Sequence, residues 1–299
     1  MTTPAAVESR PRVRAIARDL VALTKPRIIS LLLVTAIMPM YVAGSPSWQL
    51  VLAVFVGGYL MSGGANAVNM YLDRDIDHVM ARTRTRPLPA GRMTPQQVLI
   101  FGVLLATTAT FILAQAANVV AAAMGLAGFY FYVFVYTRWL KRSTPQNIVI
   151  GGAAGAFPPL VGYSAVTGSL DLTAVYLFLI IFYWTPPHFW ALALLKQHDY
   201  GRAGVPMAPL VWGEKETMRQ MMWYTAILVP LTLLPVLYGA FGWLYTASAV
   251  VLNAAFVVRL LRIVRSAEWS KHAWGTYKFS LLYLALLFTA MAVDRGLAR

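Results

Sequence analysis

Three polar side chains at the end of one apolar block have the spacing of a metal site. Asn69, Asp73 and Asp77 follow one another at intervals of four residues. Because four residues turn a helix by roughly 40° beyond a full turn, the three share one face, whereas Asp75 points elsewhere. Mg²⁺ takes oxygen ligands and commonly bridges one or two carboxylates to substrate phosphates. The pattern predicts a magnesium site; the alternative is a set of solvated carboxylates paired with nearby arginines.

Basic residues follow the acidic segment and return in a later gap between apolar blocks. Guanidinium groups bind phosphate oxygens in a bidentate fork, so these cations are candidates to bind a diphosphate. The candidates are Arg82, Arg86, Lys141 and Arg142. The alternative is that they only set the orientation of the chain in a membrane.

The elements that must position these residues are long apolar helices. Hydrophobic residues make up 59% of the 299-residue chain and charged residues only 12%, about half the share in a soluble domain. Blocks of about 20 apolar residues span a bilayer as helices. The absence of Cys excludes disulfides, thiolate metal sites and a Cys nucleophile. We predict an all-α polytopic membrane protein with nine transmembrane helices, at about 27–44, 48–70, 97–116, 118–137, 146–166, 172–195, 219–240, 242–262 and 277–294.

The basic residues predict how the chain is oriented. All of the 25 Lys and Arg except Arg295 and Arg299 fall on one side of the predicted helices. The positive-inside rule then places the N-terminus in the cytoplasm and the C-terminus outside, which requires an odd number of spans. The net charge of +14 is explained by the membrane, so no nucleic-acid partner is expected. Glu8 and Asp19 argue against a mitochondrial targeting segment.

The domain organisation is simple. Residues 1–26 form a polar cytoplasmic segment, and 27–299 form a single nine-helix domain. The two long gaps, 71–96 and 196–218, both follow an even-numbered helix and contain acidic residues. This offset of four helices hints at a duplicated half with the ninth helix added.

These residues carry a family resemblance. The string from Asn69 to Gly91, with its Arg-Pro-Leu-Pro-x-Gly end, resembles the UbiA superfamily of intramembrane prenyltransferases. Segments 136–152, 184–193 and 199–207 resemble the branch of that superfamily that farnesylates protohaem. The resemblance implies nine helices, Mg²⁺ as cofactor, farnesyl diphosphate as donor and protohaem as acceptor. The implied product is haem O, formed with addition of water and release of diphosphate.

The resemblance also implies roles for individual residues. Asn69, Asp73, Asp77 and Asp199 are the implied metal ligands, and Asp73, Asp77, Asp199 and Lys196 the implied catalytic set. Lys196 and Tyr200 stand where the superfamily has two acidic residues, so Lys196 is expected to contact diphosphate directly.

A short aromatic segment supplies candidates for acceptor binding. His188, Trp184 and Trp190 are candidate haem contacts, since an intramembrane His is a functional candidate by default. The alternatives are a structural His bonded to a backbone carbonyl freed by the adjacent prolines, and aromatic rings that merely pack.

Three other functions remain open at this point. The same fold could prenylate a quinone ring or another aromatic acceptor. A secondary transporter would hold its ionisable residues near the midplane, and a non-catalytic assembly factor would need no metal ligands. The resemblance places the chain in the cell membrane, with its site facing the cytoplasm and a haem-modifying or oxidase-assembly enzyme as a partner. The mitochondrial inner membrane is the weaker alternative.

Overall fold

The protein is a bundle of long helices. The computed structural model describes residues 10–298, and within that range nine helices are long and apolar enough to cross a membrane. This confirms the nine predicted spans and the all-α class. The spans are α2 (Pro26–Ala43), α3 (Trp48–Leu72), α5 (Pro95–Ala116), α6 with η1 and α7 (Val119–Ser143), α8 with α9 (Asn147–Thr167), α10 (Leu172–Leu195), α13 (Glu214–Leu237), α14 (Trp243–Arg265) and α15 (Trp269–Leu297).

Two spans begin earlier than the apolar pattern predicts. α13 begins at Glu214 rather than at 219, and α15 at Trp269 rather than at 277. The added turns are polar, so hydropathy alone does not reveal them. Glu214 and Glu216 lie in the first turn of α13, where negative charge interacts favourably with the helix dipole.

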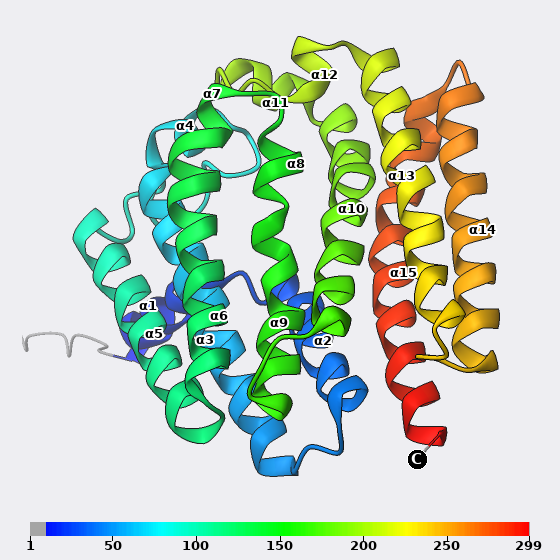
Figure 1. Cartoon of the computed structure of the whole chain (residues 1–299). Helices are drawn as coiled ribbons and strands as arrows, with labels where there is room; N and C mark the ends of the chain where they lie inside the picture. The colour runs from blue at the N-terminus through cyan, green and yellow to red at the C-terminus, as the bar shows by residue number, and fades with distance from the viewer. Residues whose placement is uncertain (1–9, 299) are drawn as a thin grey trace, which may run out of the picture.

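Short helices mark the end of the bundle that holds the two long connections. α4 (Arg74–Val79), α11 (Gln197–Arg202) and α12 (Ala208–Val211) lie at the same end as α7 (Lys141–Ser143), while the C-terminus lies at the opposite end (Figure 1). The topology therefore brings the acidic segment, the arginine-rich loop and the second long connection to one face of the bundle.

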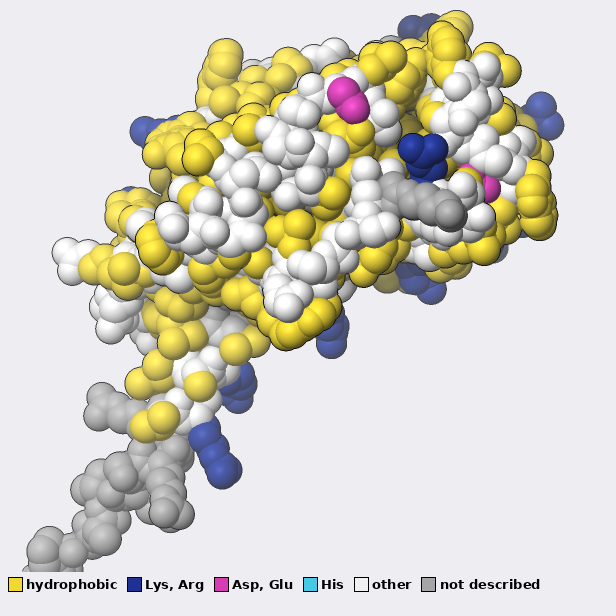
Figure 2. Space-filling model, turned by 60° about the horizontal axis from the view of Figure 1, so that its bottom comes forward, with side chains coloured by type: hydrophobic (Ala, Val, Ile, Leu, Met, Phe, Trp, Pro, Cys, Tyr) yellow, Lys and Arg dark blue, Asp and Glu magenta, His cyan; other side chains and the backbone are white. Residues whose placement is uncertain are grey.

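Before the first span, part of the polar segment 1–26 is itself helical. α1 (Arg10–Thr24) precedes α2, and residues 1–9 of the predicted segment lie outside the described residues. Most side chains visible in Figure 2 are hydrophobic. Large apolar side chains such as Phe111 and Trp139 are about two-thirds exposed. Such surfaces are uncommon in soluble monomers and are expected of a protein surrounded by lipid.

Small residues let the central helices approach closely. A Cβ atom at Gly162 of α9 would lie 1.7 Å from the backbone oxygen of Ala36 on α2. A Cβ at Gly64 of α3 would lie 2.6 Å from the backbone oxygen of Gly102 on α5. Packed membrane helices use small residues at such crossings because lipid supplies no hydrophobic force to drive them together.

The fourth span changes its winding halfway along. It begins as α6 (Val119–Tyr130) and continues as the π-helix η1 (Phe131–Leu140). The Thr137 hydroxyl donates to the carbonyl of Tyr132, five residues earlier, at 2.8 Å. Tyr136 packs against Gly151, where a Cβ would lie 2.3 Å from the tyrosine ring. Wide turns of this kind are often found at functional sites.

Candidate functional site

The predicted ligands are buried together at the junction of α3 and α4. Asn69, Asp73 and Asp77 are 4%, 1% and 2% exposed. By contrast, the side chain of Asp75 is 60% exposed. The Asn69 amide nitrogen donates to Asp73 at 2.7 Å and to the Thr137 hydroxyl of η1 at 3.1 Å. Two buried carboxylates and an amide thus form one acidic cluster beside the π-helix.

Cationic side chains from separate segments surround this cluster. Arg86 contacts Asp77 at 2.7 Å, and the Lys141 ammonium donates to Asp73. Arg142 lies 3.5 Å from Asp73 and 2.6 Å from Asp75. Its hydrogen bond lowers the pKa of Asp75 to about 2. The paired charges offset part of the cost of burying the carboxylates.

Lys25 is a further cation at the site, and the sequence reasoning missed it. Its ammonium donates to the Asn69 side-chain oxygen at 3.1 Å, from the junction between α1 and α2. Lys25 has a left-handed backbone, with φ of 56°. Burial and the positive charge of Arg86 lower the pKa of Lys25 to about 7. Its place just before the first span was visible, but the turn that brings it to Asn69 was not.

The residues of the cluster fit a divalent ion shared with a phosphate-bearing ligand. Asp73 Oδ1 is buried and has no hydrogen-bond partner. Within residues 10–298, no group of three or more acidic or His side chains could hold a metal alone. Two carboxylates completed by phosphate oxygens and water are a usual environment for Mg²⁺.

The second long connection reaches the first through Arg82. The Arg82 guanidinium donates to the Tyr200 hydroxyl at 3.0 Å. Asp199 pairs with Arg202 at 2.7 Å, and this contact, together with a hydrogen bond from the Ala81 backbone, lowers the pKa of Asp199. Lys196 is exposed, and among residues 10–298 no hydrogen bond or ion pair joins it to Asp73 or Asp77. The structure therefore brings Arg82 and Asp199 to the edge of the site but leaves Lys196 apart.

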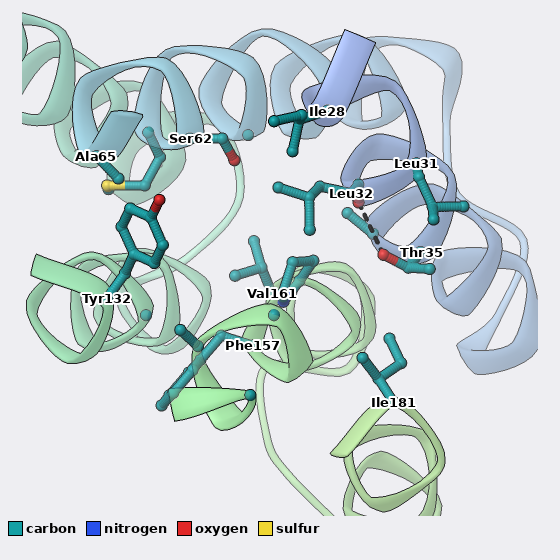
Figure 3. A pocket seen from close by; sticks show the side chains of 18 of the residues that line it. Ile28, Leu31, Leu32, Thr35, Ser62, Ala65, Tyr132, Phe157, Val161 and Ile181 are labelled. Atoms are coloured by element: carbon teal, nitrogen blue, oxygen red, sulfur yellow. Dashed lines mark hydrogen bonds between the residues drawn. The ribbon is translucent and has the colours of Figure 1, made fainter. Parts of the chain in front are cut away.

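An apolar cavity of about 360 Å³ lies beside the acidic cluster. Its polar end includes Asn66, one turn before Asn69, and the rings of Tyr132 and Tyr136 from η1. Figure 3 shows Tyr132, Ala65 and Ser62 on one side of the cavity, and Leu32, Val161 and Ile181 line it from other helices. The volume falls within the range of small-ligand pockets. The cavity can shelter an apolar chain whose charged end lies at the cluster.

The three aromatic candidates have different surroundings. Trp184 lines the cavity and stacks on His188, with ring centroids 4.1 Å apart. His188 also stacks on Tyr277 and lies 2.6 Å from the Ser280 hydroxyl. Trp190 is fully buried against Trp212 and Tyr224, away from the cavity lining. Of these three candidates Trp184 lines the cavity, and His188 lies one ring behind it, stacked on Trp184.

The hydrogen bonds of Ser280 favour one position for the proton of His188. The Ser280 hydroxyl donates its one hydrogen to the carbonyl of Tyr277 at 2.7 Å. With its hydrogen on that carbonyl, the hydroxyl accepts from His188 Nδ1–H at 2.6 Å, and Nε2 then carries the lone pair. A neutral His in this form can accept a proton or bind a metal centre through Nε2.

Comparison with known proteins places the chain in a family. The sequence pattern described as the UbiA prenyltransferase family matches residues 30–291, so the chain belongs to that family.

Individual relatives are similar over nearly the whole chain. A protoheme IX farnesyltransferase of Chloroflexus aurantiacus is 52% identical over 98% of this chain, which covers 50% of that relative. One from Symbiobacterium thermophilum is 51% identical over 96% of this chain and 98% of the relative. The chain spans only about half the length of several curated relatives, the one from Chloroflexus among them.

Solved structures share the fold at low sequence identity. A digeranylgeranylglyceryl phosphate synthase has a TM-score of 0.76 at 18% identity, covering 93% of this chain and 98% of its own. A UbiA homolog from Archaeoglobus fulgidus, bound to DMAPP and Mg²⁺, has a TM-score of 0.72 at 15% identity, covering 92% and 99%. These likenesses confirm the architecture expected from the resemblance.

Proposed function

We propose that this protein transfers the farnesyl group of farnesyl diphosphate to a vinyl group of protohaem, with addition of water, giving haem O and diphosphate. The observation that carries the proposal is the buried pair Asp73 and Asp77, surrounded by cations, near an apolar cavity whose lining includes Asn66 on the same helix as Asn69. The relatives from Chloroflexus and Symbiobacterium are both protoheme IX farnesyltransferases, which supports protohaem as the acceptor and farnesyl as the transferred group.

The cations match the charge of the leaving group. Arg86, Lys141 and Arg142 contact Asp73, Asp75 or Asp77. Two more cations lie nearby, Lys25 on Asn69 and Arg82 on Tyr200, so cationic side chains outnumber these three carboxylates. This excess suits a diphosphate, which leaves with several negative charges. Asp73 and Asp77 would hold a magnesium ion with Asn69 beside them; when bound, the ion supplies Lewis-acid neutralisation of the departing diphosphate.

The remaining site residues have supporting roles. Asp199 and Arg82 border the diphosphate from the second connection, and Asp199 would add a carboxylate if a second ion binds. Lys196, being exposed, would act as an outer cation that attracts diphosphate from the cytoplasm.

The cavity protects the reactive carbon once the diphosphate has gone. The allylic cation is sheltered from bulk water by the apolar lining until the porphyrin vinyl group attacks it. Attack leaves a positive carbon on the former vinyl group, and one water adds there. His188 Nε2 can accept the proton that this water releases, and Trp184 can stack on the porphyrin.

Two other functions are less well supported by the site. A transporter would place its acidic groups along the middle of the spans. Here Asp73 and Asp77 lie at the helix ends that carry the long connections (Figure 1). An assembly factor has no need for two buried carboxylates surrounded by cations, as at Asp73 and Asp77.

The orientation in the membrane is also part of the proposal. The arginine-rich loop, α7 and α11 lie at one end of the bundle, and the positive-inside rule makes that end cytoplasmic. We therefore place the site on the cytoplasmic side of the plasma membrane, close to a haem-modifying or oxidase-assembly enzyme that would take the product.

Mass spectrometry of the extracted haem tests the function directly. After incubation of the protein with farnesyl diphosphate, Mg²⁺ and protohaem, we expect a haem whose mass has increased by a hydrated farnesyl group. Chelation with EDTA should abolish this product, and added Mg²⁺ should restore it. An unchanged haem, together with prenylation of an aromatic acid supplied in parallel, would replace the haem assignment with the quinone-ring alternative.

Substitution of two lysines tests whether a cation inside the acidic cluster and an exposed cation contribute differently to turnover. Lys141→Gln removes the charge that contacts buried Asp73, and we expect turnover to fall by about 10²-fold, as when a donor to developing charge is lost. Lys196→Gln removes an exposed charge and should cost only a few-fold, mostly as a higher KM and a weaker dependence on salt. Equal losses of kcat in the two variants would mean that Lys196 enters the site during the reaction.

A further inference from the structure

α1 has three distinct sides, and only one of them is covered by protein. On a helical projection Asp19 and Leu23 lie on the covered side, where both are buried. Val13, Ala17 and Val21 form an apolar stripe, with Val13 68% and Val21 54% exposed. The third group is Arg14, Arg18 and Ala22, all exposed: Arg14 borders the stripe next to Val21, and Arg18 and Ala22 lie farther round the helix.

The covered side is fixed firmly to the bundle. Leu23 is fully buried with Ala67 and Met70 of α3. Asp19 pairs with Arg92 at 3.0 Å, and the same guanidinium donates to the Thr85 carbonyl in the arginine-rich loop. The apolar and basic sides of α1 therefore keep one orientation relative to the spans.

The depth of α1 along the spans matches a membrane interface. The Thr24 carbonyl accepts from the Asn66 amide, six residues before α3 ends at Leu72. Six residues correspond to about 9 Å along a helix, and interfacial helices bury their apolar face roughly 5–10 Å below the headgroups. In Figure 2 the segment next to the grey residues projects from the body, with apolar and basic side chains on different sides.

We propose that α1 lies in the plane of the membrane surface and binds anionic lipid headgroups through Arg14 and Arg18. Val13, Ala17 and Val21 enter the acyl region, while the two arginines bind lipid phosphates at the surface. Each such cation shifts binding to an anionic surface about fivefold. Because Lys25 follows α1 directly and contacts Asn69, the membrane surface is connected to the site by one short segment.

Two exposed alanines allow the placement to be tested, because the chain has no cysteine of its own. Ala17→Cys and Ala22→Cys place a fluorescent label on the apolar and the basic side of α1. The full-length protein is reconstituted in phosphatidylcholine vesicles with and without phosphatidylglycerol. We expect lipid-chain quenchers to reach the label at 17 and aqueous acrylamide to reach the label at 22. Equal access of acrylamide to both positions would rule out the in-plane placement.

The contribution of the arginines is tested in the same vesicles. Phosphatidylglycerol should protect the label at 17 further, and Arg14→Gln with Arg18→Gln should remove that gain, roughly 25-fold in the fraction of label that acrylamide reaches. The matched control is Arg262→Gln with Arg265→Gln, which removes two exposed arginines from the end of α14 and should leave the gain intact. No effect of phosphatidylglycerol, or equal loss in both pairs, would overturn lipid binding by α1. Neither result depends on prenyl transfer.

Discussion

Asp73→Asn is expected to abolish turnover while the protein stays folded. The substitution keeps the shape of a side chain that is 1% exposed, but it removes the charge that faces Lys141 and would hold the metal ion. Loss of charge stabilisation at a reacting group costs on the order of 10²–10³-fold in kcat. Haem product formed per minute, measured by mass spectrometry, gives the size of the effect.

The same motif supplies the matched control. Asp75→Asn removes a carboxylate only two residues away, whose side chain is 60% exposed and which, among residues 10–298, bonds to Arg142 and to backbone. We expect less than about a threefold loss, because an exposed ion pair contributes little. Both variants should elute from size exclusion as the wild type does. Full activity in Asp73→Asn would remove the basis for the metal assignment.

Among substitutions that replace one glycine by alanine, Gly162→Ala should produce the largest loss of stability. Its new Cβ would lie 1.7 Å from the Ala36 carbonyl oxygen, a backbone atom that cannot move unless α2 separates from α9. Overpacking in a dense interior typically costs 1–3 kcal/mol, and a clash with backbone lies at the upper end, at about 3 kcal/mol or more. Thermal unfolding in detergent, followed by circular dichroism, measures the change.

Gly155→Ala is the control for that prediction, on the same helix and two turns earlier. A Cβ at Gly155 meets nothing within 4 Å, because the residue lines the cavity. We expect its melting temperature to stay within a few degrees of the wild type. If both variants unfold at the same temperature, then α2 and α9 do not pack as closely as described.

The spans could be predicted from the sequence because lipid imposes a simple rule on it. Every block of about 20 apolar residues became a helix, and the errors lay at polar span ends, such as the first turn of α13 at Glu214 and the end of the fourth span at Ser143. The acidic motif was also visible, because Asn69, Asp73 and Asp77 lie on one continuous stretch whose spacing follows helix geometry.

Contacts between distant segments could not be predicted in the same way. Nothing in the local pattern around Lys25 shows that a left-handed residue turns its ammonium toward Asn69. Trp190 and Trp184 look alike in sequence, yet only Trp184 lines the cavity. Lys196 lies in the second long connection, as predicted, but its side chain is exposed. Each outcome depends on which side of a helix meets its neighbours, and periodicity in an apolar helix carries little of that information.

The π-helix bears on how basic residues are assigned to a site in chains of this kind. A regular α-helix rotates about 100° per residue, and the wider turns of η1 rotate less, so the difference accumulates over its ten residues. Lys141 follows η1 immediately and reaches Asp73. With ordinary winding through 131–140, the same lysine would emerge in another direction. One stretch of altered pitch thus determines whether this charge meets the acidic cluster or only faces the membrane surface.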